Sequence, residues 1–562
     1  MDDTSPLARR TSSVGPTLDF QEHLRALEAA GLLLRIDRAI NKDTELHPLV
    51  RWQFIGGIPE AERKAFLFTN VTDAKGRRYD IPVVLGALSA SPQIYALGMG
   101  RKVEEIGEAW LDAIAHPIPP IMVNHAPCQE IIVKGDELKR ADGGLKMLPV
   151  PISTPGFDAA PYLTATLCIT KDPDSGIRNM GTYRAALKAT DRLAVRMVAL
   201  ISGGAGGYLH WIKYRDRKAP MPIAIALGCG PVISFNGPQK LAADLDEIGV
   251  AGALAGQPIP MVKAATIDLE VPANAEIVIE GLIDTSVLEP EAPFGESNGY
   301  VALEAYNMPM QVTAITMRKK PVFCAIISQV TPSESSVIKK VAYEPLYLTH
   351  LREHLGIRGV KRVVMHEPFT NLRPVIFVQF AQGVARTEVW RGLSGASTFQ
   401  ARCGKVVIGI SEDIDPGNLD AVLWSIAYRS NPIEDVRLSP YGGGVQGAQY
   451  GPNKSDSTML IDATLKRPMP PLALPGKEYM EGALKIWREL GLPAVNEKSP
   501  WHGYTLGDWA PRWDIYAKRA VAGDWEQSGV ETYAQRKGGL KPESPYRTGE
   551  ETQAKGKREA GE

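Results

Sequence analysis

The chain lacks any run of about 18 consecutive apolar residues, and its first residues include acids but no apolar core. It also lacks an excess of either charge, because 63 basic and 64 acidic side chains nearly cancel over 562 residues. A membrane-spanning helix, a secretory leader and an overall field that attracts nucleic acid are therefore not expected. These absences predict a cytoplasmic protein that handles small molecules or protein partners and binds neither nucleic acid nor membranes.

Cysteine is scarce, and the cysteines show no pairing pattern. They are odd in number, none forms a CxxC pair, and most have apolar neighbours. This pattern favours reduced thiols over a disulfide framework. The positions are Cys128, Cys168, Cys229, Cys324 and Cys403.

The length exceeds that of one hydrophobic core and predicts two or three packed units. Residues 1–122 are expected to form an N-terminal α/β unit. Asp19 would cap a helix that ends at Gly31, and a strand would follow over Leu32 to Ile36. The prolines at positions 117–120 predict the boundary of this unit.

Residues 123–330 contain many short apolar runs separated by Gly, Pro and Asp, which predicts an antiparallel sheet or barrel. One helix is expected to interrupt the strands near Arg192 to Ile201. The expected strands include Leu163 to Thr170, Met221 to Leu227, Ile277 to Gly281, Val312 to Met317 and Val322 to Ser328.

Residues 331–490 alternate strands and helices and indicate a second α/β unit. Strands are expected over Val375 to Phe380 and Val406 to Ile410. A helix should be opened by Asp415, Pro416 and Asn418 and should bury an apolar stripe. That stripe is Leu419, Val422, Leu423 and Ile426. Residues 491–562 form an extension whose charged end is expected to be disordered, so the fold class is α+β multidomain.

The stretch from Glu291 to Glu296 places two carboxylates five positions apart around Pro293 and Gly295. An unturned strand would separate these carboxylates by about 17 Å. Pro293 fixes its own φ and Gly295 permits backbone angles closed to other residues, so the segment suits a turn that aims two acids at one place. A solvated surface turn is the alternative interpretation.

A second hexad runs from Asn179 to Arg184 around a glycine. The guanidinium of Arg184 is a planar fork of donors that stays charged, so it could be clamped between Glu291 and Glu296. An ordinary ion pair at a strand edge is the alternative.

His210 follows a glycine run that is not a phosphate-binding Walker loop, because no GK[ST] follows. Together with Asn179 and Glu247 it would supply an imidazole, an amide oxygen and a carboxylate, a set that suits a divalent ion. The GxGxxG at residues 442–447 follows no strand and precedes Pro452, so we do not interpret it as a dinucleotide site.

The order of these motifs resembles the UbiD family of decarboxylases. The hexad that ends at Arg184 comes first, and His210, Glu247 and the pair Glu291 and Glu296 follow at the spacing of the family. The similarity in general character extends from near Leu24 to about Thr464. Agreement of several separate motifs in one chain makes the resemblance specific.

The resemblance implies a prenylated flavin mononucleotide in a central split β-barrel domain, held through its phosphate by a divalent ion such as Mn²⁺ with K⁺ nearby. It implies reversible non-oxidative decarboxylation of an aromatic, heteroaromatic or α,β-unsaturated acid, with Glu296 as the proton donor. The implied catalytic residues are Arg184, Glu291 and Glu296, and the implied metal ligands are Asn179, His210 and Glu247. The implied cofactor-binding residues are Asn179, Met180, Gly181, Thr182, Tyr183, Arg184, Leu209, His210, Glu247 and Arg402.

Two of the departures of the chain from the family concern the contacts to the cofactor. Leu209 stands where some members have glutamine, so a polar contact to flavin or substrate is missing. The basic residue for the flavin phosphate is not cleanly placed; Arg402 is the preferred assignment and Lys454 the other option.

The need for a flavin also follows from the chemistry, because loss of CO₂ from an sp² carbon leaves electrons that no side chain can delocalise. The implied partners are a flavin prenyltransferase, which supplies the cofactor, and copies of the chain, which form a dimer or hexamer through the third unit. The alternatives are an FMN-dependent reductase and a non-catalytic assembly protein. A free acid and a larger aryl thioester, of the phthaloyl type for example, both remain open as substrates.

Overall fold

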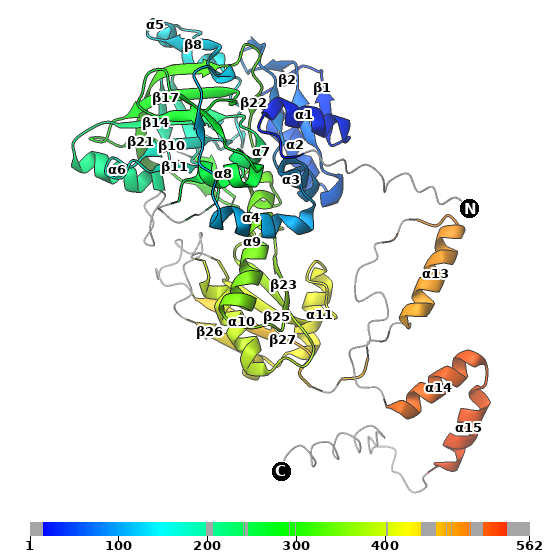
Figure 1. Cartoon of the computed structure of the whole chain (residues 1–562). Coiled ribbons are helices and arrows are strands. Elements are labelled where there is room, and N and C mark those ends of the chain that lie inside the picture. Colours follow the sequence, from blue (N-terminus) through cyan, green and yellow to red (C-terminus); the bar gives the residue numbers. More distant parts are fainter. Residues whose placement is uncertain are drawn as a thin grey trace.

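The computed structural model shows a two-lobed body and a set of separate helices (Figure 1). The upper lobe contains the chain up to β22 (Phe323–Cys324), and α9 (Glu334–Thr349) leads from it into the lower, C-terminal domain. The structure describes residues 15–197, 206–239, 241, 245–291, 293–297, 299–400, 403–439, 457–467, 469–471, 473, 475–493, 495 and 510–536.

The N-terminal unit contains the helix and the strand that the sequence predicts. The Asp19 side chain accepts a hydrogen bond from the Glu22 N–H (3.0 Å), which caps α1. A four-stranded sheet in the order β1-β3-β6-β22 forms its centre, so a strand from beyond residue 320 completes it. The elements are α1 Phe20–Ala29, β1 Leu33–Ile36, β2 Ile40–Asn41, α2 Leu46–Ile55, β3 Ala65–Phe68, β4 Val71–Thr72, β5 Arg78–Tyr79, β6 Val83–Leu85, α3 Pro92–Met99 and α4 Ile106–Ala115.

The central region is a ten-stranded sheet organised around one long strand, β21 (Ala305–Met317). The main path of strands is β11-β10-β14-β17-β21-β13-β12-β9, and β8 and β18 also pair with β21. The other strands are β8 Ile131–Lys134, β9 Tyr162–Leu163, β10 Leu167–Lys171, β11 Arg178–Gly181, β12 Ala185–Ala189, β13 Arg192–Val195, β14 Met221–Leu227, β17 Ile277–Ile283 and β18 Glu289–Glu291. The helices that accompany it are α6 Gly206–Asp216, α7 Pro231–Ser234 and α8 Glu247–Ala255.

One prediction for this region is met only as the antiparallel sheet, and one needs correction. The strand path has two free ends, β11 and β9, so the described residues form an open sheet and no closed barrel. The helix expected near Arg192 to Ile201 is wrong at its start, because Arg192–Val195 is strand β13, paired with both β12 and β21. Leu193, Ala194 and Val195 are all buried there, and such a short apolar run does not distinguish a buried strand from a helix. Residues 198–201 lie outside the described part.

The C-terminal domain is a five-stranded sheet in the order β23-β24-β25-β27-β26 with helices on both faces. Val389 and Leu393 of α10 pack on one face with Val407, whereas Val422 of α11 packs on the other with Ile408. This two-sided packing is the α/β arrangement that the sequence predicts. The elements are β23 Val360–Met365, β24 Val375–Phe380, α10 Arg386–Thr398, β25 Val406–Ser411, α11 Leu419–Arg429, α12 Pro432–Asp435, β26 Val436–Ser439 and β27 Thr458–Ala463.

The buried stripe predicted for α11 is only partly correct. Asn418 caps the helix and Val422 is buried, but Leu419 and Leu423 are 43% and 54% exposed. The buried face of the helix differs from the predicted stripe because it includes Arg429, which donates a 2.8 Å hydrogen bond to Asp413.

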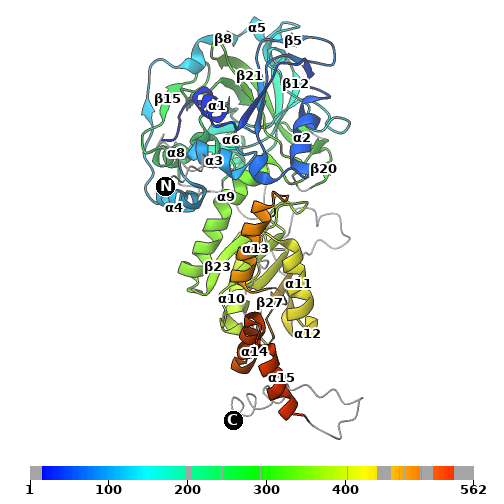
Figure 2. The same ribbon diagram turned by 90° about the vertical axis from the view of Figure 1, so that its right-hand side faces the viewer.

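Beyond residue 475 the structure describes three helices, α13 Lys477–Glu489, α14 Pro511–Ala522 and α15 Trp525–Ala534, and none of them contains a buried residue. Figure 2 shows α14 and α15 below the C-terminal domain. The disorder predicted for the end of the chain concerns residues that lie almost entirely outside the described part.

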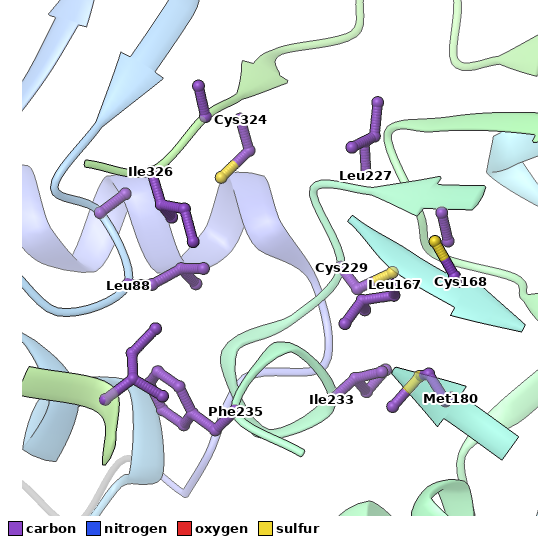
Figure 3. Packing of buried hydrophobic residues seen from close by; sticks show 14 of the residues in the cluster. Leu88, Leu167, Cys168, Met180, Leu227, Cys229, Ile233, Phe235, Cys324 and Ile326 are labelled. Atoms are coloured by element: carbon purple, nitrogen blue, oxygen red, sulfur yellow. The ribbon is translucent and has the colours of Figure 1, made fainter. Parts of the chain in front are cut away.

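The hydrophobic core is continuous between the N-terminal unit and the central sheet. Leu88 and Ile326 face Phe235 on one side, and Cys168 and Met180 lie with Cys229 on the other (Figure 3). All five cysteines are buried and free, as the sequence predicts. In the described part of the chain, no helix combines the length and the apolar character needed to cross a bilayer.

Candidate active site

The segment around Pro293 folds back on itself and brings its two acids to one place. Glu291 ends β18, which pairs with β21, while β19 (Phe294–Gly295) pairs with β20 (Val301–Ala302). Asp158 holds the turn, since its carboxylate accepts hydrogen bonds from the Gly295 N–H (2.9 Å) and the Thr154 N–H (2.7 Å).

Arg184 lies between the two carboxylates. Its Nε and Nη2 donate to the two oxygens of Glu291, at 2.8 and 3.0 Å, and its Nη1 donates to Glu296. Burial alone would lower the pKa of Arg184, but the bond to Glu291 and the charges of both carboxylates outweigh it and raise that pKa. The guanidinium therefore stays charged and uses all three nitrogens to fix the acids.

The two carboxylates differ in their surroundings. The Glu291 side chain is fully buried, and besides Arg184 it accepts a bond from Asn307 Nδ2 (3.1 Å) and lies 4.0 Å from Arg196. The Glu296 side chain is 21% exposed, and Arg184 is its hydrogen-bond donor among the described residues. Glu291 is thus fixed by several donors, whereas Glu296 has oxygen lone pairs free for another partner.

Two aromatic rings and one glycine pack around this cluster. The Arg184 guanidinium lies 4.5 Å from the ring centroid of Phe294 and 5.9 Å from that of Tyr162. Gly295 does not have a positive φ, which corrects the predicted reason for a glycine here. Instead, a Cβ at Gly295 would collide with Thr154 Oγ1.

The three predicted metal ligands converge on the free edge of the central sheet. Asn179 lies on edge strand β11, directly opposite Thr170 of β10, and Thr170 Oγ1 is 2.9 Å from His210 Nδ1. The next residue along β11, Met180, donates its N–H to a carboxylate oxygen of Glu247 (3.0 Å). The structure thus brings together side chains that are up to 68 positions apart in the sequence.

These side chains have the protonation properties of metal ligands. Burial lowers the pKa of His210, which favours the neutral imidazole, and Nε2 has no hydrogen-bond partner among the described residues. Burial raises the pKa of Glu247 to about 7, although the hydrogen bond from the Met180 N–H opposes this shift. No cation is among the causes of the shift, so this carboxylate lacks a countercharge. No group of three His, Cys, Asp or Glu in the described part of the chain could hold a metal ion.

The other predicted binding residues lie along the same strand and helix. The Tyr183 hydroxyl accepts bonds from Asn179 Nδ2 and the Gly207 N–H, both at 3.2 Å, which joins β11 to the start of α6. The Thr182 N–H donates to Gly237 O (2.9 Å), and Leu209 is 37% exposed on α6. Gly181 ends β11. Arg402 and Lys454 lie outside the described residues, as does the GxGxxG segment.

Sequence reasoning missed several neighbours of the acids. Arg196, Asn307, Tyr162 and Phe294 all contact Arg184 or Glu291. Phe294 stands inside the Glu291–Glu296 hexad, so its position in the sequence could have indicated that it lies beside the acids. The other three come from distant strands and carry no local signal.

The comparisons with known proteins agree with this architecture. The chain matches three models of 3-octaprenyl-4-hydroxybenzoate carboxy-lyase: its N-terminal domain over residues 24–114, its Rift-related domain over 121–330 and its C-terminal domain over 336–463. HmfF from Pelotomaculum thermopropionicum, solved in complex with FMN, is 30% identical with a TM-score of 0.71, and the alignment covers 82% of this chain and 96% of that chain.

Two further structures extend the comparison. An evolved dimeric form of HmfF in complex with prFMN is 29% identical, with a TM-score of 0.70 over 82% of this chain and 98% of that one. The closed form of vanillic acid decarboxylase from Sedimentibacter hydroxybenzoicus is 25% identical, with a TM-score of 0.69 over 85% and 100%. The fold and the site therefore define a UbiD-class carboxy-lyase. The chain belongs to the UbiD family.

Proposed function

We propose that the protein carries out reversible non-oxidative decarboxylation of an aromatic, heteroaromatic or α,β-unsaturated carboxylic acid with prenylated FMN as its cofactor. The observation that carries this proposal is the Arg184 guanidinium bonded to both Glu291 and Glu296. Such a trio has no role in a flavin reductase, which needs a nicotinamide site and no fixed pair of acids.

Glu296 is the proton donor in this proposal. It is the acid with free oxygen lone pairs and partial exposure, so it can take a proton from solvent and deliver it to the carbon that has lost CO₂. Glu291, buried and held by Arg184 and Asn307, keeps the guanidinium in place. Arg184 in turn orients Glu296 through the hydrogen bond that its Nη1 donates.

The residues at the edge of β11 fit a divalent cation, Mn²⁺ by the resemblance. Asn179, His210 and Glu247 would hold it and, through it, the phosphate of the flavin; the flavin when bound supplies the electron sink that decarboxylation requires. The buried, uncompensated carboxylate of Glu247 supports this assignment. K⁺ stays a prediction, since no group of described residues identifies its ligands, and so does the split barrel as the flavin-binding fold.

The metal assignment predicts that Glu247→Ala loses the cofactor. Removal of the carboxylate would weaken the binding of the cation and, through it, the binding of the flavin phosphate. Metal content by mass spectrometry and flavin absorbance of the purified protein measure this. Asp136→Ala, an exposed acid on α5 (Asp136–Lys139), is the control. Full flavin occupancy in Glu247→Ala would contradict the assignment.

The decisive experiment is co-expression with a flavin prenyltransferase, followed by a screen of aromatic acids for CO₂ release and H/D exchange. Glu296→Gln should keep flavin and metal but lower both rates by about 10²–10⁴-fold, the usual contribution of a general acid. Glu304→Gln, an exposed acid in the same region, should leave both unchanged. A comparable rate in Glu296→Gln would exclude Glu296 as the donor.

The protein is also proposed to be a homo-oligomer that associates through its C-terminal domain. Leu423 on α11 and Ile433 on α12 are 54% and 92% exposed, which supports an apolar contact surface there. Sedimentation analysis of the full chain and of Leu423→Asp tests this, because the substitution should shift the chain toward the monomer.

A further inference from the structure

An ion pair joins the two residues that directly precede two of the proposed metal ligands. Arg178 comes before Asn179 on edge strand β11, and Asp246 comes before Glu247 at the start of α8. The Nε and Nη2 of Arg178 both donate to Oδ2 of Asp246, at 3.2 and 2.5 Å. Because the two side chains are only 15% and 28% exposed, this pair is better shielded from solvent than an ordinary surface pair.

The same carboxylate also begins helix α8. Its other oxygen, Oδ1, accepts a hydrogen bond from the Ile248 N–H (3.0 Å), which makes Asp246 the N-cap of the helix. Glu247 is the first residue of that helix, so the position of Asp246 determines where the Glu247 side chain begins. A single side chain therefore ties strand β11 to the first turn of α8, which lies against it (Figure 1).

Strand β11 depends on such a tie because it lies at the end of the central sheet. Its neighbour in the sheet is β10, and no strand among the described residues covers its other side. The Met180 N–H donates to Glu247 (3.0 Å), which makes a second link to α8. Arg178 and Met180 flank Asn179, so the two links hold the backbone on both sides of that proposed ligand.

A second acid extends the ion pair into an alternating chain of charges. The Nη1 of Arg178 donates to Glu270 of β16 (Glu270–Pro272) at 3.3 Å, and the other oxygen of Glu270 lies 3.0 Å from the Lys171 ammonium on β10. All three nitrogens of the Arg178 guanidinium are therefore bonded to carboxylates. The four charged side chains border a cavity of about 490 Å³, so a shorter side chain at position 178 leaves no hole in a packed apolar core.

The positive charge of Arg178 does not by itself favour a cation next to it. On Coulomb's law alone, removal of a guanidinium beside a cation site would strengthen the binding of the cation. A geometric role for Arg178 predicts the opposite result. Ligands from two different elements bind a metal ion tightly only when those elements are held at the right separation, and the residues around the ligands provide this support.

We propose that Arg178 and Asp246 are positioning residues of the metal site. Their ion pair fixes β11 against the start of α8 and thereby sets the separation of Asn179 and Glu247. This inference rests on the metal assignment in the proposed function, and it adds two residues that do not bind the cation themselves. Arg178 has donors only, and both oxygens of Asp246 already accept hydrogen bonds from the chain.

The test is titration of the chelator-treated full chain with Mn²⁺ at a fixed concentration of FMN, followed through the loss of the EPR signal of free Mn²⁺. Arg178→Gln and Asp246→Asn should each weaken Mn²⁺ binding by about 10–100-fold, the usual effect of residues that support metal ligands. Asparagine is also a good N-cap, so Asp246→Asn removes the charge of the pair and keeps the start of α8. Arg178→Lys should recover part of the affinity.

Arg217→Gln is the charge-matched control, because Arg217 forms a half-exposed ion pair with Asp174 elsewhere in the same domain. It should change the affinity for Mn²⁺ by less than about twofold. Since Arg178 and Asp246 act through one contact, the double variant Arg178→Gln/Asp246→Asn should bind Mn²⁺ about as weakly as either single variant. Melting temperatures show that each variant is folded. Arg178→Met and Asp246→Ser replace any variant that does not fold.

Two results would overturn the positioning role. They are unchanged or tighter Mn²⁺ binding by folded Arg178→Gln, and losses of the two single variants that add up in the double variant. A wild type that binds no Mn²⁺ would refute the metal assignment and the positioning role with it. A wild type that binds Mn²⁺ and shows these losses in its variants, but releases no CO₂ from any acid, would refute the reaction and leave the positioning role in place.

Discussion

At the scale of the residue, the surroundings of Arg184 give different roles to two acids that look equivalent in the sequence. Arg184 binds both oxygens of the buried Glu291 side chain. It makes a single bond to Glu296, whose oxygens therefore remain available to another hydrogen-bond partner. A guanidinium can do both at once because its donors lie in one plane and point in different directions. A lysine ammonium cannot reproduce this geometry.

Arg184→Lys should therefore keep the charge but lose the clamp. We expect the free energy of unfolding to fall by about 2 kcal/mol, because Glu291 stays buried with fewer bonds, and kcat/KM to fall by about 100-fold. Arg192→Lys is the matched control, since its pair with Glu289 is half-exposed, and it should change stability by less than about 0.5 kcal/mol. Urea unfolding and steady-state kinetics measure both. Equal effects of the two substitutions would show that the fork geometry is unimportant.

Gly295→Ala should displace the loop that carries Glu296. The added methyl would collide with Thr154 Oγ1, so the turn must shift, while the proposed metal ligands lie on other elements, β11, α6 and α8. We expect activity to fall at least tenfold with unchanged flavin content. Gly482→Ala on α13 meets nothing within 4 Å and should have no effect on activity. Thr154→Ala in the Gly295→Ala background should restore part of the activity; failure to do so would place the cause elsewhere.

The sequence predicted the members of the acid cluster but not their neighbours. Glu291, Glu296 and Arg184 stand in compact motifs with turn residues between them, so local spacing carries the information. Asn307 and Arg196 reach the same point only because β21 and β13 pair in a particular register. That register depends on the burial of whole strands, and no short motif encodes it.

At the scale of the element, α9 is tied to the N-terminal unit by one buried carboxylate. The Glu334 oxygens accept the N–H groups of Gly86, Leu88 and Ile327, at 3.0 to 3.3 Å. With β22 completing the N-terminal sheet, this fixes the linker before α9 against the upper lobe. The start of α9 is therefore held rigidly.

The buried histidines of the N-terminal helices α1 and α2 predict that stability depends on pH. Burial lowers the pKa of His23 to about 4 and of His47 to about 3, from an ordinary value of 6.5, despite a backbone contact for each. Below pH 6.5 the unfolded chain takes up protons that the folded chain does not, so stability is lost as the pH falls. At pH 5.5 each histidine should remove about 1.4 kcal/mol.

Urea unfolding at pH 7.5 and 5.5 measures this loss. His23→Gln should remove about half of the pH dependence that the two histidines cause. His116→Gln, an exposed histidine with a 76% exposed side chain, should leave it unchanged. The same pH dependence in all three proteins would contradict the assignment.

Prediction of the central strands was mixed. Leu163 to Thr170 is divided between β9 and β10, and Val322 to Ser328 is strand only at Phe323–Cys324, which belongs to the N-terminal sheet. Met221–Leu227 is the strand predicted, because its continuous apolar run has buried neighbours on both sides. The face of α11 was partly wrong, since the buried pair of Arg429 and Asp413 decides its rotation against the apolar pattern. Polar pairs of this kind override periodicity and cannot be recognised without the partner strand.

At the scale of the whole molecule, the body and the C-terminal helices differ in burial and in their similarity to the family. The three family models end at residue 463, and the buried core does not extend beyond that point in the described residues. The apolar side chains Tyr479, Ile486 and Leu490 are 50%, 56% and 67% exposed. The fold and the candidate site are therefore complete without α13, α14 and α15.

Deletion of residues 475–562 should leave the body folded. Because the described helices beyond residue 475 bury no residue, the melting temperature should change by less than about 2 °C, a shift that corresponds to less than about 2 kcal/mol in a chain of this size. Flavin content should stay the same, since Asn179, His210 and Glu247 lie far from the deleted segment in the fold. Calorimetry and flavin absorbance of the full and shortened chains measure this. A melting temperature lower by 5 °C or more, together with a smaller sedimenting species, would show that these helices pack on another copy of the chain.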